Sequence, residues 1–523
     1  MRTRPALTAL ALAGLLAGGA EAAPRSAGIK DPDTRAWFQI TEALSSDAME
    51  GRDTGSPGYD RAADVVAARF KAAGLKPAGD KGGWFQTFPV HESKVETDGT
   101  SIEMVREDGT RLKFKFLHDI SVRPTDQLPA LLDAPLTFRG YCGPDAVADV
   151  ENPADTSRGK VVVCFNTKRK GLPSAADRIK TAAAAHAAGL IEVDDPYFTI
   201  EPPRWPAAYA RSVAIAGSPP PAAPSLPVMT MSAEAFKAMV GAQGNADLIL
   251  KSGGAREELP NFDFGARLSA HFHLTRRDYA AKNALAVLPG RDPKLSGEHL
   301  VLSAHLDGYG YGEPVNGDGL YNGALDDAAY VGTLIRFADR HRGRPLRRSV
   351  VFAAFTGEEK GLLGAHWFVD HPTVPKASIV ADINLDQLRP LFPLKILTEL
   401  AVDDSSLGQT ARGLAAAMGV RIQPDPEPER GLLQRADHWP FMQAGIPATG
   451  FIFGYEPGTE AERRYREWYQ IRYHRPQDDL TQPMDFEAAG DFNRFFYKLS
   501  ETVADADEAP KWAPASAYAG KRP

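Results

Sequence analysis

The sequence lacks three features, and each absence argues against one class of protein. After the first 22 residues it has no apolar run approaching the roughly 20 residues of a membrane span. It has only two cysteines among 523 residues, so a disulfide-rich scaffold is excluded. Its formal net charge of −7 gives no basic excess for nucleic acid. Hydrophobic residues make up 43% and charged residues 24%, as in an ordinary globular protein large enough for two to four domains.

The first 22 residues have the pattern of a secretory signal peptide. A basic start, Met1–Arg4, precedes the apolar stretch Ala6–Ala20, and Ala20-Glu21-Ala22 provides small residues at a cleavage site. The alternative, an uncleaved anchor, is disfavoured because the apolar stretch is short for a span. We therefore expect an exported protein, periplasmic or secreted, that has no membrane attachment after cleavage.

Three apolar runs between His299 and Asp386 each lead to residues that can bind metals. Short β-type runs that alternate with helical patterns predict βαβ units around a buried parallel sheet. Ligands of such sheets gather at the carboxyl ends of the strands, where the polar residues of this stretch stand. The runs and the residues that follow them are Leu300–Ala304 with His305, Ser349–Phe355 with Glu358 and Glu359, and Ile379–Leu385 with Asp386.

These residue types favour a catalytic metal site. His, Asp and Glu without Cys suit zinc, manganese or cobalt. Asp326 stands at the start of a predicted helix, Asp327–His341, where a carboxylate could bridge two metals. Of the adjacent pair Glu358 and Glu359, one could bind metal while the other acts as general base. Each feature alone is more often structural, such as a helix cap or a solvated helix start.

Several motifs in one order resemble the co-catalytic di-zinc exopeptidases. This family includes secreted bacterial leucyl-type aminopeptidases, glutamate carboxypeptidase II and the glutaminyl-peptide cyclases. The matching segments span about Asn283 to Leu480 and read SAHLDG, DGLYNGALDDA, FTGEEKGLLGA, INLDQ, ADHWPFMQAGIPATGF and YHRPQDDL.

The resemblance implies a role for each matching residue. Asp326 would bridge two Zn²⁺ ions, or other divalent metals, with Glu359 and His474 completing one site. His305 and Asp386 would complete the other. The four remaining roles are Glu358 as general base, Tyr473 as stabiliser of the oxyanion, Asp307 as the residue orienting His305, and Asp437 with His438 as a structural support.

The family likeness also implies a fold and a set of possible functions. We expect a mixed, mostly parallel central sheet with helices on both faces, and a smaller inserted α/β protease-associated domain. The expected activity is removal of N-terminal residues from peptides. A carboxypeptidase of the glutamate type, a one-zinc cyclase and a non-catalytic binding module stay open, as does the oligomeric state. One departure from many relatives is the bulk of Tyr330 and Val331 after the paired aspartates, which puts local packing in question.

The predicted organisation has five parts. Residues 1–22 form the signal peptide, 31–130 the first part of the catalytic domain, 131–254 the protease-associated insert, 255–507 the main catalytic part and 508–523 a loose tail. The Pro-rich stretch Pro202–Pro227 is expected to be a surface loop near the cleft. Cys142 and Cys164 both fall in the insert, where export would permit a disulfide but spacing cannot decide the pairing.

Overall fold

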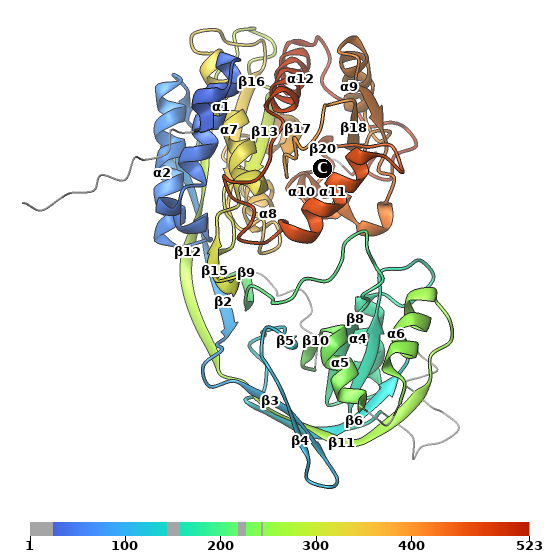
Figure 1. Ribbon diagram of the computed structural model, residues 1–523. Coiled ribbons are helices and arrows are strands. Elements are labelled where there is room, and N and C mark those ends of the chain that lie inside the picture. Colours follow the sequence, from blue (N-terminus) through green and yellow to red (C-terminus); the bar gives the residue numbers. More distant parts are fainter. Residues whose placement is uncertain (1–24, 144–156, 218–225, 242–243, 522–523) are drawn as a thin grey trace, which may run out of the picture.

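The computed structural model contains two bodies, each built around one large sheet (Figure 1). It describes residues 25–143, 157–217, 226–241 and 244–521. The predicted signal peptide, residues 1–22, therefore lies outside the described residues. Within the described residues, no helix combines the length and apolar character needed to cross a bilayer.

The upper body is organised around a ten-stranded mixed sheet. Its central four strands, in the order β20-β17-β13-β16, are parallel, and antiparallel strands extend it on both sides. The expected mixed sheet is thus confirmed, with its parallel part confined to the centre apart from the outer β18–β19 pair. The strands in order are β19 (Arg421–Gln423), β18 (Ile396–Leu400), β20 (Ala448–Phe453), β17 (Ile379–Leu385), β13 (His299–His305), β16 (Ser349–Phe355), β12 (Leu274–Leu288), β2 (Phe85–Val95) and β9 (Ala210–Ile215), with β1 (Lys76–Pro77) beside β12.

Helices cover both faces of this sheet, which explains why its central strands are buried along almost their whole length. Every residue of β16 and β17 is buried. Tyr330, whose bulk was in question, is buried and packs against Phe492 with ring centroids 5.3 Å apart. One face is covered by α1 (Pro32–Leu44), α2 (Pro57–Ala72), α7 (Ala329–Arg340), α9 (Ser406–Ala417), α11 (Glu460–Ile471) and α12 (Phe486–Asp505), and the other by α8 (Leu363–Asp370) and α10 (His438–Gln443).

The lower body is built on an eight-stranded sheet with its own apolar core. Three short helices, α4 (Ala175–Ala184), α5 (Ala233–Val240) and α6 (Ala246–Ala255), pack against it. Its strands in order are β4 (Arg111–Phe114), β3 (Ser101–Arg106), β11 (Asn261–His271), β6 (Leu131–Arg139), β7 (Val161–Asn166), β8 (Gly189–Asp194), β10 (Val228–Met231) and β5 (Ile120–Val122).

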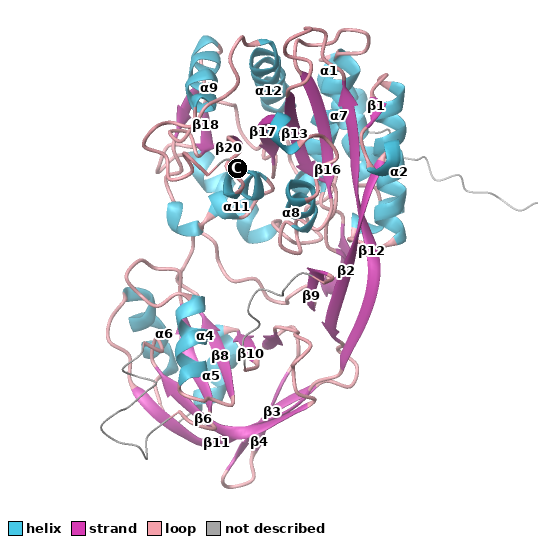
Figure 2. Cartoon of the chain, turned by 180° about the vertical axis from the view of Figure 1, so that it is seen from behind, coloured by secondary structure: helices cyan, strands magenta, loops and turns pink. Residues whose placement is uncertain are grey.

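This sheet extends beyond residues 131–254 on both sides. Strands β3, β4 and β5 come from the stretch assigned by sequence to the first catalytic part, and β11 from the start of the second. The reason is pairing: β11 lies between β3 and β6, so the segments that flank the expected insert complete its sheet. The long strands β2 and β12 then connect the two bodies, as the view from behind shows (Figure 2).

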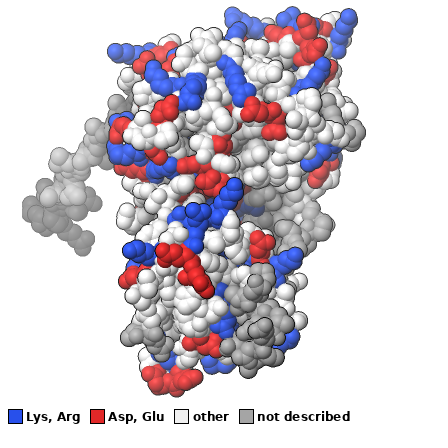
Figure 3. Space-filling view, turned by 90° about the vertical axis from the view of Figure 1, so that its right-hand side faces the viewer, with Lys and Arg blue, Asp and Glu red and all other residues white. Residues whose placement is uncertain are grey.

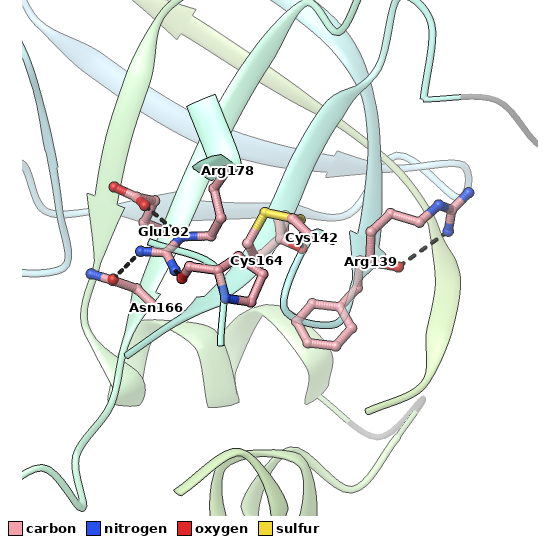
Figure 4. Close-up of a disulfide and its surroundings, with 9 residues drawn as sticks. Arg139, Cys142, Cys164, Asn166, Arg178 and Glu192 are labelled. Atoms are coloured by element: carbon pink, nitrogen blue, oxygen red, sulfur yellow. Dashed lines mark hydrogen bonds and ion pairs between the residues drawn. A yellow bond between two sulfur atoms is a disulfide. The ribbon is translucent and has the colours of Figure 1, made fainter. Parts of the chain in front are cut away.

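A disulfide joins the only two cysteines within the lower body. Cys142, which follows β6, is bonded to Cys164 in β7, and both side chains are fully buried (Figure 4). Close by, buried Arg178 donates from Nε to Glu192 Oε1 at 2.7 Å. The bond settles a pairing that spacing left open, and it belongs to the lower body, whereas the predicted metal ligands belong to the upper body.

The loop 195–209 returns from the lower body to the upper one. It follows β8 of the eight-stranded sheet and leads into β9, which pairs with β2 of the ten-stranded sheet. Arg475 Nη1 donates to the carbonyl of Pro206 at 2.6 Å, which fixes the loop against the upper body. On the face drawn in Figure 3, basic side chains gather at the level where the two bodies meet. Two additional short strands, β14 (Gly310–Val315) and β15 (Asp318–Tyr321), form a hairpin beside the loop.

Candidate metal centre

The carboxyl ends of three neighbouring parallel strands bring the predicted metal ligands together. β13 ends at His305, β16 is followed by Glu358 and Glu359, and β17 by Asp386. Asp326 precedes α7, and His474 follows α11. Parallel strands end at one edge of the sheet, so ligands distant in sequence converge there.

The ligand atoms form two sets that share Asp326. Atoms of His305, Asp326 and Asp386 lie within 4.8 Å of one another, as do atoms of Asp326, Glu359 and His474. In the first set, His305 Nε2 lies 3.2 Å from Asp326 Oδ1 and 3.7 Å from Asp386 Oδ1. In the second, His474 Nε2 lies 3.4 Å from Asp326 Oδ2 and 3.2 Å from Glu359 Oε2. Each carboxylate oxygen of Asp326 therefore faces a different histidine.

The local backbone at Asp326 differs from the predicted helix start. A π-type turn spans Ala324–Ala328, and α7 begins only at Ala329. Asp326 and Asp327 have non-helical backbone angles. The backbone N–H groups of Leu325 and Asp326 instead donate to the Asp478 carboxylate, each at 3.0 Å. Asp478 thus sets the position of the carboxylate that the two sets share.

Asp307 contacts both His305 and the segment that carries Glu358. The backbone carbonyl of Asp307 lies 3.0 Å from His305 Nδ1, which leaves Nε2 facing the carboxylates. Its side chain accepts from the Glu358 N–H at 3.1 Å and from Thr54 Oγ1 at 3.1 Å. Asp307 therefore contacts the imidazole through its backbone carbonyl and the Glu358 segment through its carboxylate, whose Oδ1 is 3.8 Å from His305 Nδ1.

Sequence reasoning missed the buried Arg52. Its guanidinium donates to the backbone carbonyls of Leu306, Asn322 and Gly323 at 2.7–2.8 Å. These carbonyls belong to the segments that follow β13 and β15 (Asp318–Tyr321). A fully buried arginine satisfied by carbonyls acts as a brace, and only its place within the turn-forming stretch GRDTGSPG could have suggested it.

The two histidines have opposite protonation tendencies. Burial lowers the pKa of His474 to about 4, so its imidazole is neutral at neutral pH, as a metal ligand must be. Burial opposes charge on His305 too, but the surrounding carboxylates, Glu358 first among them, raise the pKa of His305 well above its usual value. Burial likewise opposes the charge of Asp326, yet the neighbouring His305 and His474 hold the pKa of Asp326 below its usual range. The cluster of carboxylates around His305 and Asp326 therefore favours a bound or protonated cation at this position.

This donor set fits two divalent metal ions. Asp326 Oδ2 and Asp386 Oδ1 are buried and accept no hydrogen bond from any described residue. Each histidine presents Nε2 to the carboxylates while its Nδ1 is engaged elsewhere. Oxygen and imidazole ligands without thiolates suit zinc in a catalytic site.

Glu358 stands beside both sets but belongs to neither. Its Oε2 lies 4.0 Å from His305 Nε2. Burial raises the pKa of Glu358 well above its usual value, against the opposing effect of His305. A carboxylate with a raised pKa is suited to accept and return a proton near neutral pH.

Tyr473 is buried and its hydroxyl accepts a hydrogen bond from Arg435 Nη2 at 2.9 Å. Because the hydroxyl accepts this bond, its own proton stays available for donation. Burial raises the pKa of Tyr473, which keeps the phenol protonated. A second tyrosine that sequence reasoning missed, Tyr309, contacts His474, with its hydroxyl 2.8 Å from Nδ1.

Part of the upper body is similar to a known peptidase family. Residues 283–500, which include all the predicted metal ligands, match the model of Peptidase family M28. This matched region is called the M28 domain below. Leupeptin-inactivating enzyme 1 from Streptomyces exfoliatus is 26% identical over 53% of this chain and 61% of its own length. A glutamate carboxypeptidase 2 homolog from Caenorhabditis elegans is 23% identical over 54% of this chain and 39% of its own length.

Two solved structures have the same overall fold as this chain. An aminopeptidase from Aneurinibacillus sp. strain AM-1 superposes with a TM-score of 0.62, covering 91% of this chain and 95% of its own at 17% identity. The Bacillus subtilis zinc aminopeptidase BSAP gives a TM-score of 0.56 with the same coverage and 16% identity. Both likenesses extend over the lower body as well as the M28 domain.

Proposed function

We propose that the chain is a zinc-dependent exopeptidase, and specifically an aminopeptidase that releases N-terminal residues from peptides. One observation carries the proposal: two sets of three ligand atoms share Asp326 at the strand ends of an M28 domain. The names of the structural neighbours, both aminopeptidases, support the choice of the amino end. The basic, then apolar, start of the sequence supports export to the periplasm or medium.

Two zinc ions would be held on either side of Asp326. His305 and Asp386 would complete one site, and Glu359 and His474 the other. When bound, the two ions would polarise the scissile carbonyl and make a nearby water molecule more acidic. The remaining contributions come from the chain itself.

Glu358 is the proposed general base. It lies at the edge of the first ligand set, and its raised pKa lets the carboxylate take a proton from the attacking water and return it to the leaving amine. Tyr473 is the proposed donor to the oxyanion, because Arg435 occupies its lone pair and leaves its proton free. Asp307 is the proposed positioning residue: its backbone carbonyl orients the His305 imidazole, and its carboxylate holds the backbone N–H of Glu358.

A carboxypeptidase is the second candidate, because the relative from Caenorhabditis elegans is named as a glutamate carboxypeptidase 2 homolog. The two differ in which end of a peptide is shortened. We would incubate zinc-loaded protein with one unblocked peptide of asymmetric sequence and follow the products by mass spectrometry. Stepwise loss from the amino end is expected. Loss from the carboxyl end would replace the aminopeptidase with the second candidate, and no loss with zinc bound would reject both.

A further inference from the structure

A large pocket opens directly beside the second ligand set. It has a volume of about 450 Å³, and Glu359, His474 and Tyr309 form part of its wall. Its other wall is the loop 195–209 with the start of β9. Five cationic side chains line this basic pocket: Arg123, Arg204, Arg211, Lys360 and Arg475. Glu359 supplies the only carboxylate among the described lining residues.

Three of these cations already have partners. Arg211 makes a two-point ion pair with Asp53 at 2.5 and 2.6 Å. Lys360 donates to the Tyr209 hydroxyl at 2.7 Å and lies 3.4 Å from Asp53. Arg475 donates to the Pro206 carbonyl. These contacts hold the loop and β9 against the rest of the upper body. The remaining two cations of the pocket are Arg123 and Arg204.

Arg204 has an unsatisfied donor. Its Nη1 is buried and donates to no described residue. Glu201 Oε1 lies 3.9 Å from the other terminal nitrogen, Arg204 Nη2, and the Glu201 carboxylate is already bonded to Arg435 at 2.8 Å and to Lys168 at 3.1 Å. The Arg204 side chain is 21% exposed and lines the pocket, so a ligand in the pocket could supply an acceptor to its guanidinium.

The position of Arg204 places that acceptor beside the predicted reacting groups. Its guanidinium lies over the Tyr473 ring, 4.4 Å from the ring centroid. Arg123, an exposed side chain on the segment after β5, lines the same pocket. A carboxylate fits both guanidinium groups, because it matches the planar donor fork.

We propose that the basic pocket binds a carboxylate of the peptide substrate, with Arg204 as its main partner and Arg123 as a second. The proposal rests on the exopeptidase function and specifies its substrate class: peptides with an acidic side chain, or short peptides whose terminal carboxylate reaches the pocket. The arginines of the charged segment before His474 do not form this pocket. Arg463 and Arg464 pair with Glu460, and Arg466 pairs with Glu427 and Glu462.

Matched substrates test the proposal on the zinc-loaded protein. Ala-Ala-Ala and Ala-Ala-Ala-amide differ only in the terminal carboxylate, and Ala-Glu-Ala-amide and Ala-Gln-Ala-amide only in the side chain. We expect one pair to show a kcat/KM about ten- to a hundred-fold higher for the carboxylate-bearing member, the effect of a hydrogen bond to a charged group. The pair that shows it identifies the source of the carboxylate.

Variants then assign the preference to the pocket. Arg204→Gln should bring that kcat/KM ratio close to one, Arg204→Lys should retain part of it, and Arg123→Gln should lower it less. Exposed Arg158, on the turn before β7, is the matched control: Arg158→Gln should leave the ratio unchanged. Zinc content and circular dichroism report whether each variant is folded.

The outcomes separate this inference from the function on which it rests. Turnover with equal kcat/KM within both pairs, or a ratio that Arg204→Gln leaves intact, would overturn the carboxylate site while keeping the exopeptidase. Without turnover of any peptide the exopeptidase fails, and glutarate binding measured by calorimetry then tests the site directly. Binding to the wild type that is lost in Arg204→Gln would support the site, and equal binding to both would reject it.

Discussion

The two bodies differ in where they keep their polar groups. In the ten-stranded sheet, buried carboxylates and imidazoles cluster at the ends of the parallel strands. The eight-stranded sheet has an apolar core and a disulfide, and its loop 195–209 brings Glu201 and Arg204 to the other body. Rigid strand ends suit groups that must hold metals in fixed geometry, whereas a loop suits groups that select a ligand. We therefore predict that the upper body carries out peptide hydrolysis and that the loop from the lower body selects the substrate.

The strongest test of this division is Glu358→Gln. An amide cannot accept the proton, so kcat should fall by about 10²–10⁴-fold, measured by peptide hydrolysis. Both zinc ions should stay bound because Glu358 is in neither ligand set. Glu467→Gln, on the exposed side of α11, serves as control. Near-normal turnover in Glu358→Gln would remove the base assignment.

Tyr473→Phe should have the next largest effect. Losing one donor to the oxyanion should lower kcat by about 10²–10³-fold with little change in KM, as steady-state kinetics would measure. Arg435 keeps its bonds to Glu201, so the fold around the site should persist. Tyr311→Phe, at an exposed tyrosine, should be neutral. If the two variants behave alike, Tyr473 has only a packing role.

Removing the disulfide should affect the lower body alone. Cys142 and Cys164 are 22 residues apart, and opening such a loop costs about 3 kcal/mol of unfolding free energy. In the double Cys→Ala variant, hydrogen exchange should accelerate in β6, β7 and β8 while zinc content is unchanged. If hydrogen exchange accelerated equally in β13 and β17, the two bodies would unfold as one unit, which would contradict the expected division between them.

Glu399 in β18 should have the smallest effect on catalysis, because it belongs to neither ligand set, and its expected effect is a pH dependence of the stability of the upper body. Burial raises the pKa of Glu399 to about 8, against a hydrogen bond from the Thr449 hydroxyl. The folded state thus holds a proton that the unfolded state releases above about pH 4.3. The unfolding free energy should fall by on the order of 4 kcal/mol as pH rises from about 5 to 9. Glu399→Gln should reduce this dependence of unfolding free energy on pH, measured by denaturant titrations at several pH values. If the dependence is unchanged, other groups cause it.

The sequence predicted the parts of the site that depend on local order. His305 and Asp386 follow β-type apolar runs, so their place at strand ends could be read from the chain. The helix after Asp326 was placed too early, because Asp478, distant in sequence, fixes the turn before it. The disulfide required the adjacency of β7 to the segment following β6, which spacing cannot supply.

The groups that sequence reasoning missed depend on contacts between distant segments. Tyr309 meets His474 across 165 positions, and Arg435 meets Glu201 across 234. Arg204 lies in a stretch expected only to be a loop near the cleft, with nothing to indicate Tyr473 as its neighbour. Likewise, only pairing places β3 and β11 in the lower sheet, where β11 lies between β3 and β6.

The central claim is that one aspartate connects two metal sites at the strand ends. Anomalous X-ray diffraction at the zinc edge, on crystals of zinc-loaded protein, tests it most directly. Two peaks are predicted, one among His305, Asp326 and Asp386 and the other among Asp326, Glu359 and His474. A single peak, or peaks that do not share Asp326, would contradict the account.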